Sequence, residues 1–171
     1  MLRHAAGMGL ALSKQKSDDT RMSWPISSTR IVRGHHVASG LNGDPRFPSG
    51  TIAMQREHFA RLGLDLGDYY QGTLNLSIKP QRHRVIRPLR TFEHLKWHPT
   101  EPAETFSFFN ARLQQSEQTY NALIYLPHPE TKPKHFQAVG VLEVLAPWIE
   151  GLEYGLTVDL AIDPAQMILE A

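Results

Sequence analysis

The clearest hydrophobic pattern in the chain is a strict alternation over residues 73–78. Leu74, Leu76 and Ile78 alternate with polar side chains, and Pro80 follows. Because successive side chains of a strand point to opposite faces, the pattern predicts a strand with one apolar and one polar face. Further strands, rich in branched and aromatic residues, are predicted at 31–38, 106–113, 120–126, 138–145 and 156–162.

A helical spacing replaces the alternation at residues 51–62. Four side chains recur on one face of the predicted helix: Ile52, Gln55, Phe59 and Leu62. Thr51 is placed to cap its start and Gly63 to end it. Residues 89–97 predict a second, short helix. About six short strands with one or two short helices predict a mainly β fold closed into a barrel, because closure removes exposed strand edges.

Length and composition indicate a single domain with a tail. The chain has 171 residues, of which 41% are hydrophobic. Residues 1–28 are polar over most of their length, so we expect a disordered or weakly ordered tail that the fold does not need. Residues 29–171 form the predicted domain. No apolar run approaches the ~20 residues of a membrane span, and we expect a cytoplasmic protein without membrane partners.

The absence of cysteine excludes disulfides, thiolate metal sites and cysteine nucleophiles. The net charge of +1 gives no general attraction to nucleic acid. Residues 79–92 are nevertheless basic, without an acid, and residues 137–171 are acidic, without a base. The basic stretch is either a phosphate-binding surface or a solvated edge that discourages strand pairing. It lacks interleaved aromatic residues, so we expect no nucleic-acid partner.

Several segments, in order, resemble the CTP-dependent riboflavin kinases first known from archaea. The sequence Gly-Thr-Leu-Asn at residues 72–75 follows a glycine-rich loop (39–47) and a helix, as in that family. Glu-Val-Leu-Ala-Pro at 143–147 resembles the family's Glu-Ile-Ile-Ala-Pro segment. The resemblance covers residues 31–162. It implies a six-stranded cradle-loop (RIFT-like) β-barrel that transfers a phosphoryl group from CTP to riboflavin, giving CDP and FMN.

Thr73 and Asn75 are the candidate metal ligands. Positions i and i+2 of a strand point the same way, about 6.6 Å apart, so both present neutral oxygens to one side. Such oxygens suffice for Mg²⁺ when nucleotide phosphates supply the charge. The resemblance implies that the matching threonine and asparagine bind Mg²⁺. The alternative is a polar ladder on the sheet with no ligand.

The glycine-rich loop is the candidate nucleotide-binding segment. Its glycines allow backbone N–H groups to approach an anion, and Arg46 adds charge. It lacks the Walker pattern, which excludes an ordinary P-loop. The alternative is a plain surface loop. The candidate residues are Gly40, Leu41, Asn42, Gly43, Asp44 and Arg46.

The resemblance places a flavin near Glu143 and Thr131. A carboxylate at Glu143 can accept a hydrogen bond from the ribityl chain or act as the base on the attacking hydroxyl. The alternative for Glu143 is an ordinary strand residue. The expected cofactor is Mg²⁺, the expected partners are CTP, CDP, riboflavin and FMN, and the protein is expected as a monomer or small homo-oligomer.

Departures from the family support a second function. Asn42 and Pro45 alter the family's Gly-Leu-Gly-Glu-Gly loop, and no basic residue follows Pro147, where Glu150 stands instead. An acid close to a triphosphate weakens binding. The alternative is therefore a non-catalytic barrel that binds a nucleotide or flavin and has lost kinase activity.

Overall fold

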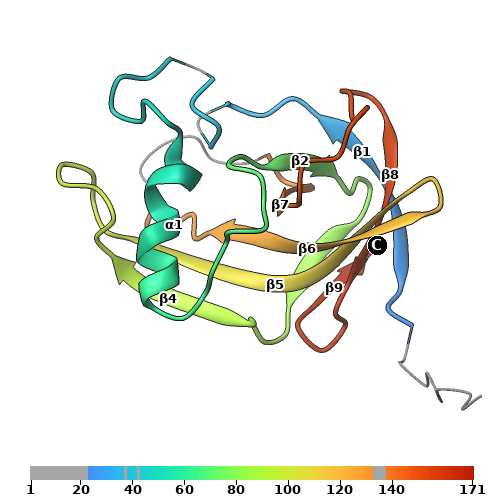
Figure 1. Cartoon of the computed structure of the whole chain (residues 1–171). Coiled ribbons are helices and arrows are strands. Elements are labelled where there is room, and N and C mark those ends of the chain that lie inside the picture. The colour runs from blue at the N-terminus through green and yellow to red at the C-terminus, as the bar shows by residue number, and fades with distance from the viewer. Residues whose placement is uncertain (1–22, 37, 42, 133–137) are drawn as a thin grey trace, which may run out of the picture.

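The computed structural model describes residues 23–36, 38–41, 43–132 and 138–171. This part of the chain is mainly β, as the sequence predicts, with one helix, α1 (Thr51–Arg61) (Figure 1). The strands are β1 (Ile26–Val32), β2 (Leu74–Ser77), β3 (Arg82–Val85), β4 (Arg90–Leu95), β5 (Glu104–Gln115), β6 (Gln118–Pro127), β7 (Val141–Leu145), β8 (Thr157–Ile162) and β9 (Met167–Glu170).

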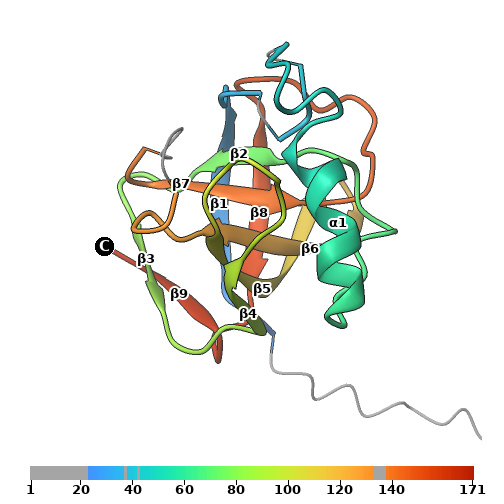
Figure 2. The same cartoon turned by 90° about the vertical axis from the view of Figure 1, so that its left-hand side faces the viewer.

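Seven strands pair antiparallel in the order β4-β5-β6-β7-β2-β1-β8. β5 also pairs with β8, with Ala111 opposite Ile162, so six strands close into a ring. β4 adds to β5 outside the ring. β3 and β9 form a separate pair, which lies on the opposite side of the molecule from α1 in Figure 2. Closure leaves no open edge among the six ring strands.

Alternating side chains of the ring strands enter two hydrophobic clusters. All six strands contribute to the first cluster, which therefore lies inside the ring; Leu76 and Val144 are members. The second cluster lies on the outer face of β5, β6 and β7, where Phe108 and Leu145 pack with Phe59 of α1. The sheet is thus covered on its outer face by the helix.

α1 confirms the helix predicted at 51–62, but its start is different. Gly50, not Thr51, is the N-cap, and no side chain caps the helix. Gly50 has φ +85°, and a Cβ there would lie 2.3 Å from the carbonyl oxygen of Ala38. The Ile52 N–H donates to that carbonyl at 3.3 Å. Thr51 is left to face the pocket described below. No helix in the described part of the chain is long and apolar enough to cross a membrane.

The helix predicted at 89–97 is wrong, because this segment contains the strand β4. Phe92 and Leu95 both pack against the second cluster at a spacing of three residues, which looks helical. In a strand, a register shift between Phe92 and Leu95 also places these two side chains on one face. His94, inside the shift, has φ +48°. A bulge inserts an extra residue and returns the next side chain to the same face.

β1 begins at Ile26, earlier than the predicted strand at 31–38 and inside the predicted tail. Ile26, Ser27 and Ser28 pair with Ala161, Leu160 and Asp159 of β8. Thr29 is buried and donates its hydroxyl to the Val158 carbonyl at 2.9 Å. This serine- and threonine-rich segment resembles a loop in composition, yet its backbone pairs with β8 and the hydroxyl of Thr29 bonds to the same strand. Residues 1–22 lie outside the described part.

The other predicted strands are confirmed with shifted ends. β2 matches the alternation at 73–78, and β5, β6, β7 and β8 occupy the segments predicted at 106–113, 120–126, 138–145 and 156–162. The basic segment at 79–92 contains β3, which pairs with β9. Arg84 there forms an exposed ion pair with Glu170 at 3.1 Å. At this position the basic segment meets an acidic side chain of the same molecule.

Candidate functional site

A row of side chains crosses three ring strands on their outer face. Asn75 of β2 lies directly opposite Glu143 of β7, and Glu143 lies opposite Tyr125 of β6. Residues opposite one another in an antiparallel pair point to the same side. The row faces away from Leu76 and Val144, which enter the ring. Polar groups on strands far apart in sequence therefore share one surface.

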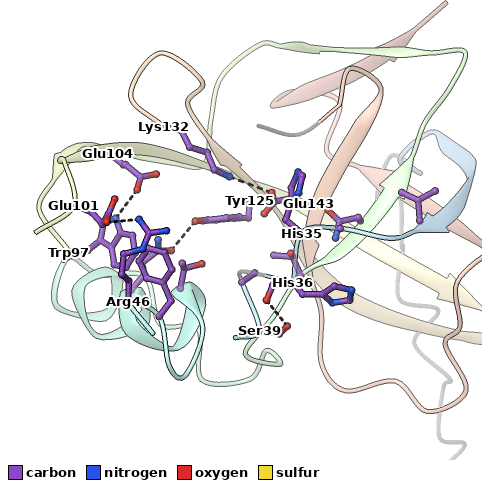
Figure 3. A pocket seen from close by; sticks show the side chains of 18 of the residues that line it. His35, His36, Ser39, Arg46, Trp97, Glu101, Glu104, Tyr125, Lys132 and Glu143 are labelled. Carbon is purple, nitrogen blue, oxygen red and sulfur yellow. Dashed lines mark hydrogen bonds and ion pairs between the residues drawn. The ribbon is translucent and has the colours of Figure 1, made fainter. Parts of the chain in front are cut away.

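This row forms the floor of a pocket of about 110 Å³ between the sheet and α1. Thr51 and Gln55 of α1 line it, together with parts of the connection from β1 to α1. Figure 3 shows polar side chains at both ends of the pocket, with Tyr125 between them: Glu143 and His35 at one end, and Arg46, Trp97, Glu101 and Glu104 at the other.

The first end contains the candidate metal ligands. Thr73 and Asn75 both line the pocket, on the opposite face to Leu76, as the alternation predicts. Gly34 packs against the Asn75 amide so closely that a Cβ would lie 2.2 Å from Nδ2. A glycine at 34 therefore lets the backbone after β1 reach the Asn75 side chain.

Glu143, the candidate catalytic residue, shares this end of the pocket. It is 6% exposed, and its Oε1 lies 3.8 Å from Nζ of Lys132. A buried carboxylate requires such a partner, because removing an ion from water costs several kcal/mol. Sequence reasoning did not identify Lys132, which comes from the loop after β6. A lysine in an otherwise proline-rich loop carries no periodic signal.

The glycine-rich loop contributes less to the pocket than predicted. Ser39, Arg46 and Phe47 line the pocket, whereas Gly40, Leu41, Gly43 and Asp44 do not. Gly40 has φ +76° and packs on Gly50, where its Cβ would lie 2.7 Å from the Gly50 nitrogen. The loop thus supports the start of α1. Asn42 lies outside the described residues.

Arg46 is held by two carboxylates. Its guanidinium contacts Asp44 at 2.6 Å and Glu101 at 2.9 Å. The hydrogen bond to Asp44 is the largest cause of its raised pKa, and the bond to Glu101 adds to it. The charge of Arg46 is therefore compensated within the protein before any anion arrives.

Thr131 has a structural role in this arrangement. Its Oγ1 accepts a hydrogen bond from the Thr105 N–H at 2.9 Å and donates to the His128 carbonyl at 3.1 Å. These bonds fix the turn after β6 to the start of β5. Thr131 does not line the pocket, but the next residue, Lys132, does.

The second end of the pocket was not expected from the sequence. Glu104 is 7% exposed, and its Oε1 accepts a hydrogen bond from Trp97 Nε1 at 3.3 Å. Burial raises the pKa of Glu104, the Trp97 bond and Lys132 lower it, and Glu101 raises it. Gln55 offers the one signal that could have found this end, because it is a polar residue on the apolar face of the predicted helix.

Tyr125 connects the two ends. Its hydroxyl donates to Oε1 of Gln55 at 2.9 Å. Burial raises the pKa of Tyr125 well above its usual value, and the carboxylates of Glu143 and Glu104 raise it further. The phenol therefore stays protonated and serves as a fixed hydrogen-bond donor.

Among the described residues, no group of three or more histidine, aspartate or glutamate side chains is placed to bind a metal ion. No family model matches the sequence, and no curated protein matches it either.

Proposed function

We propose that this protein is a cradle-loop β-barrel that transfers a phosphoryl group from CTP to riboflavin, with Mg²⁺ as the cofactor. The observation that carries the proposal is the convergence of Thr73, Asn75 and Glu143 on one pocket. The family resemblance selects the same three residues from segments about 70 positions apart in the sequence. The ring of six strands agrees with the proposed barrel.

The donor atoms at this end fit Mg²⁺. Thr73 makes no hydrogen bond through its hydroxyl within the described part of the chain, and that oxygen is not sealed off from the pocket. Mg²⁺ prefers oxygen ligands and is commonly held by few protein groups, with phosphates and water completing the octahedron. Thr73 and Asn75 would hold the ion with the nucleotide phosphates. The ion would neutralise charge on the transferred group.

Glu143 would act as the base. Its carboxylate would accept the proton of the terminal ribityl hydroxyl, whose oxygen attacks the terminal phosphorus of CTP as CDP leaves. Lys132, whose Nζ lies 3.8 Å from Oε1 of Glu143, would hold the carboxylate in position for this role. The balanced outcome is FMN, CDP and one proton.

The acidic character of the pocket favours a second function, a non-catalytic flavin- or nucleotide-binding protein. The carboxylates of Glu101, Glu104 and Glu143 line the pocket, whereas Arg46 is already paired with Asp44 and Glu101. A triphosphate is less well accommodated here than a neutral ring system. Flavin binding without turnover would identify this alternative.

The two functions are separated by a turnover assay. Purified protein would be incubated with riboflavin, Mg²⁺ and either CTP or ATP, and FMN would be measured by chromatography with fluorescence detection. We expect FMN with CTP, and loss of at least 100-fold in Asn75→Leu. Asn121→Leu makes the same change at an exposed position of β6 and should keep full activity. Unchanged turnover in Asn75→Leu would refute the metal site. Absence of FMN with both CTP and ATP would refute the kinase.

A further inference from the structure

Two polar side chains at the second end of the pocket retain unused hydrogen-bonding atoms. Gln55 is 1% exposed and uses Oε1 to accept from Tyr125. Glu104 uses Oε1 to accept from Trp97. Within the described part of the chain, neither Nε2 of Gln55 nor Oε2 of Glu104 makes a hydrogen bond. Neither atom is fully buried, because among the described residues Gln115 Oε1 is the one fully buried side-chain N or O atom without a partner. Both atoms are therefore reachable from the pocket that they line.

These two atoms form a complementary pair. Nε2 of Gln55 is a donor and Oε2 of the ionised Glu104 is an acceptor. Gln55 and Glu104 line the same pocket, and the Tyr125 hydroxyl, which donates to Gln55, points toward the Glu104 end of it in Figure 3. An ammonium ligand would match Glu104 but would leave the Gln55 donor unused. A carbonyl beside an N–H uses both.

The walls at this end are aromatic. Phe47 and Trp97 are buried, line the pocket and lie with ring centroids 5.7 Å apart. Tyr125 adds a third ring, stacked on Phe106. Flat side chains of this kind favour a planar ligand over a branched aliphatic one.

We propose that Gln55 and Glu104 recognise the lactam or imide edge of a planar heterocycle, with the ligand N–H bonded to Glu104 and its carbonyl to Gln55. Uracil rings and the pyrimidine part of the flavin ring system carry such an edge. The assignment deepens the proposed function and rests on it in one respect: the same pocket holds the flavin. It places the ring at the Trp97–Glu104 end, away from Thr73 and Asn75.

A ligand N–H would supply the hydrogen bond that Oε2 of the buried Glu104 carboxylate lacks among the described residues. A buried polar group without a partner costs free energy, and a site built for an N–H rejects an analogue that lacks it. Replacing the N–H by N–CH₃ removes the donor and adds a group that must fit against Glu104. Discrimination between the two ligands therefore reports on this contact.

The test uses riboflavin, 3-methylriboflavin and uridine with the full chain, without Mg²⁺ or CTP, and follows flavin fluorescence or titration heat. We expect riboflavin to bind at least tenfold more tightly than 3-methylriboflavin. In Glu104→Leu, riboflavin should lose at least tenfold in affinity while 3-methylriboflavin changes less than about threefold. Glu104→Gln keeps the side-chain shape but leaves one acceptor oxygen for both the Trp97 N–H and the ligand N–H, so riboflavin should lose affinity in this variant too, while 3-methylriboflavin changes little.

Glu117→Leu is the matched control, because Glu117 lies at an exposed turn and does not line the pocket. It should keep the discrimination between riboflavin and its methylated analogue. Equal affinity of the two flavins for the unmodified protein, or equal losses in Glu104→Leu, would overturn the assignment. So would failure of both riboflavin and uridine to bind at millimolar concentration. Discriminating binding without FMN formation would refute only the kinase, and FMN formation without discrimination would refute only this assignment.

Discussion

Glu104 is a carboxylate in an environment that disfavours its charge. Trp97 and Lys132 favour the ionised form, but burial and Glu101 outweigh them, so the pKa in the folded protein is raised above the ordinary value. The native state then binds this proton more tightly than the unfolded chain does. Stability from this group is present at low pH and is lost as pH rises through the unfolded and then the folded pKa.

Glu104→Gln should therefore stabilise the protein at pH 8, because the substitution replaces a buried charged side chain by a neutral one. The stabilisation should shrink as pH falls toward the ordinary glutamate pKa of about 4.3. Thermal unfolding of both proteins between pH 4 and pH 8 measures the difference. Glu117→Gln, at an exposed turn position, should give no such pH-dependent gap. A difference in melting temperature that grows as pH falls would contradict a raised pKa for Glu104.

Gly34 is a second single-residue determinant of the pocket. A Cβ at this position would meet the Asn75 amide at 2.2 to 3.0 Å. We expect Gly34→Ala to displace the Asn75 side chain, lower stability by about 1–3 kcal/mol as overpacking does, and weaken Mg²⁺-dependent nucleotide binding at least tenfold. Gly67→Ala is the control, since its Cβ would meet only the exposed Asp65 carboxylate. Calorimetric titration that finds unchanged Mg²⁺–nucleotide affinity in Gly34→Ala would contradict this role.

At the scale of elements, the sequence was informative where one periodicity dominates. The alternation around Leu74 and Leu76 gave β2 and its two faces, and helical spacing gave α1. β4 was missed because a bulge returns Phe92 and Leu95 to one face. The second end of the pocket was missed for a different reason: Gln55 lies on α1 and Glu104 on β5, and only the packing of the helix against the sheet brings them to one pocket.

The N-terminal half of β1 gives a test of where the fold begins. Trp24 packs under Arg112, whose guanidinium carbon lies 4.3 Å from the ring centre, and Ile26 to Ser28 pair with β8. A chain that begins at Ser23 should melt where the full chain melts. A chain that begins at Thr29 should lose about 2 kcal/mol or more, since it loses a cation–π contact and several backbone hydrogen bonds.

That loss corresponds to a fall in the melting temperature of several degrees for a protein of this size. Differential scanning fluorimetry on the two truncated chains measures it. Equal midpoints for the chains that begin at Ser23 and at Thr29 would show that the first half of β1 contributes nothing. The N-terminal boundary of the fold would then lie at residue 29, as the sequence pattern suggested.

For the whole molecule, the pocket joins elements that are far apart along the chain. The ring strands β2, β6 and β7 form its floor, and α1, the segment after β1 and the residues around Trp97 form its walls. A ligand that contacts all of them binds only the folded state. It therefore stabilises the whole fold by about 2.7 kcal/mol at a hundredfold excess over Kd.

Thermal stabilisation by ligands should separate the two ends of the pocket. Riboflavin at a hundredfold excess over its Kd should raise the midpoint by about 5 to 10 °C with or without Mg²⁺. CTP should raise it only with Mg²⁺, because Thr73 and Asn75 are neutral and bind phosphate through the ion. Asn75→Leu should abolish the CTP effect and keep the riboflavin effect, whereas Glu104→Leu should do the reverse. Asn121→Leu should respond as the unmodified protein does. If both variants lose both effects together, the pocket acts as one undivided site and the separation into a metal end and a ring end is wrong.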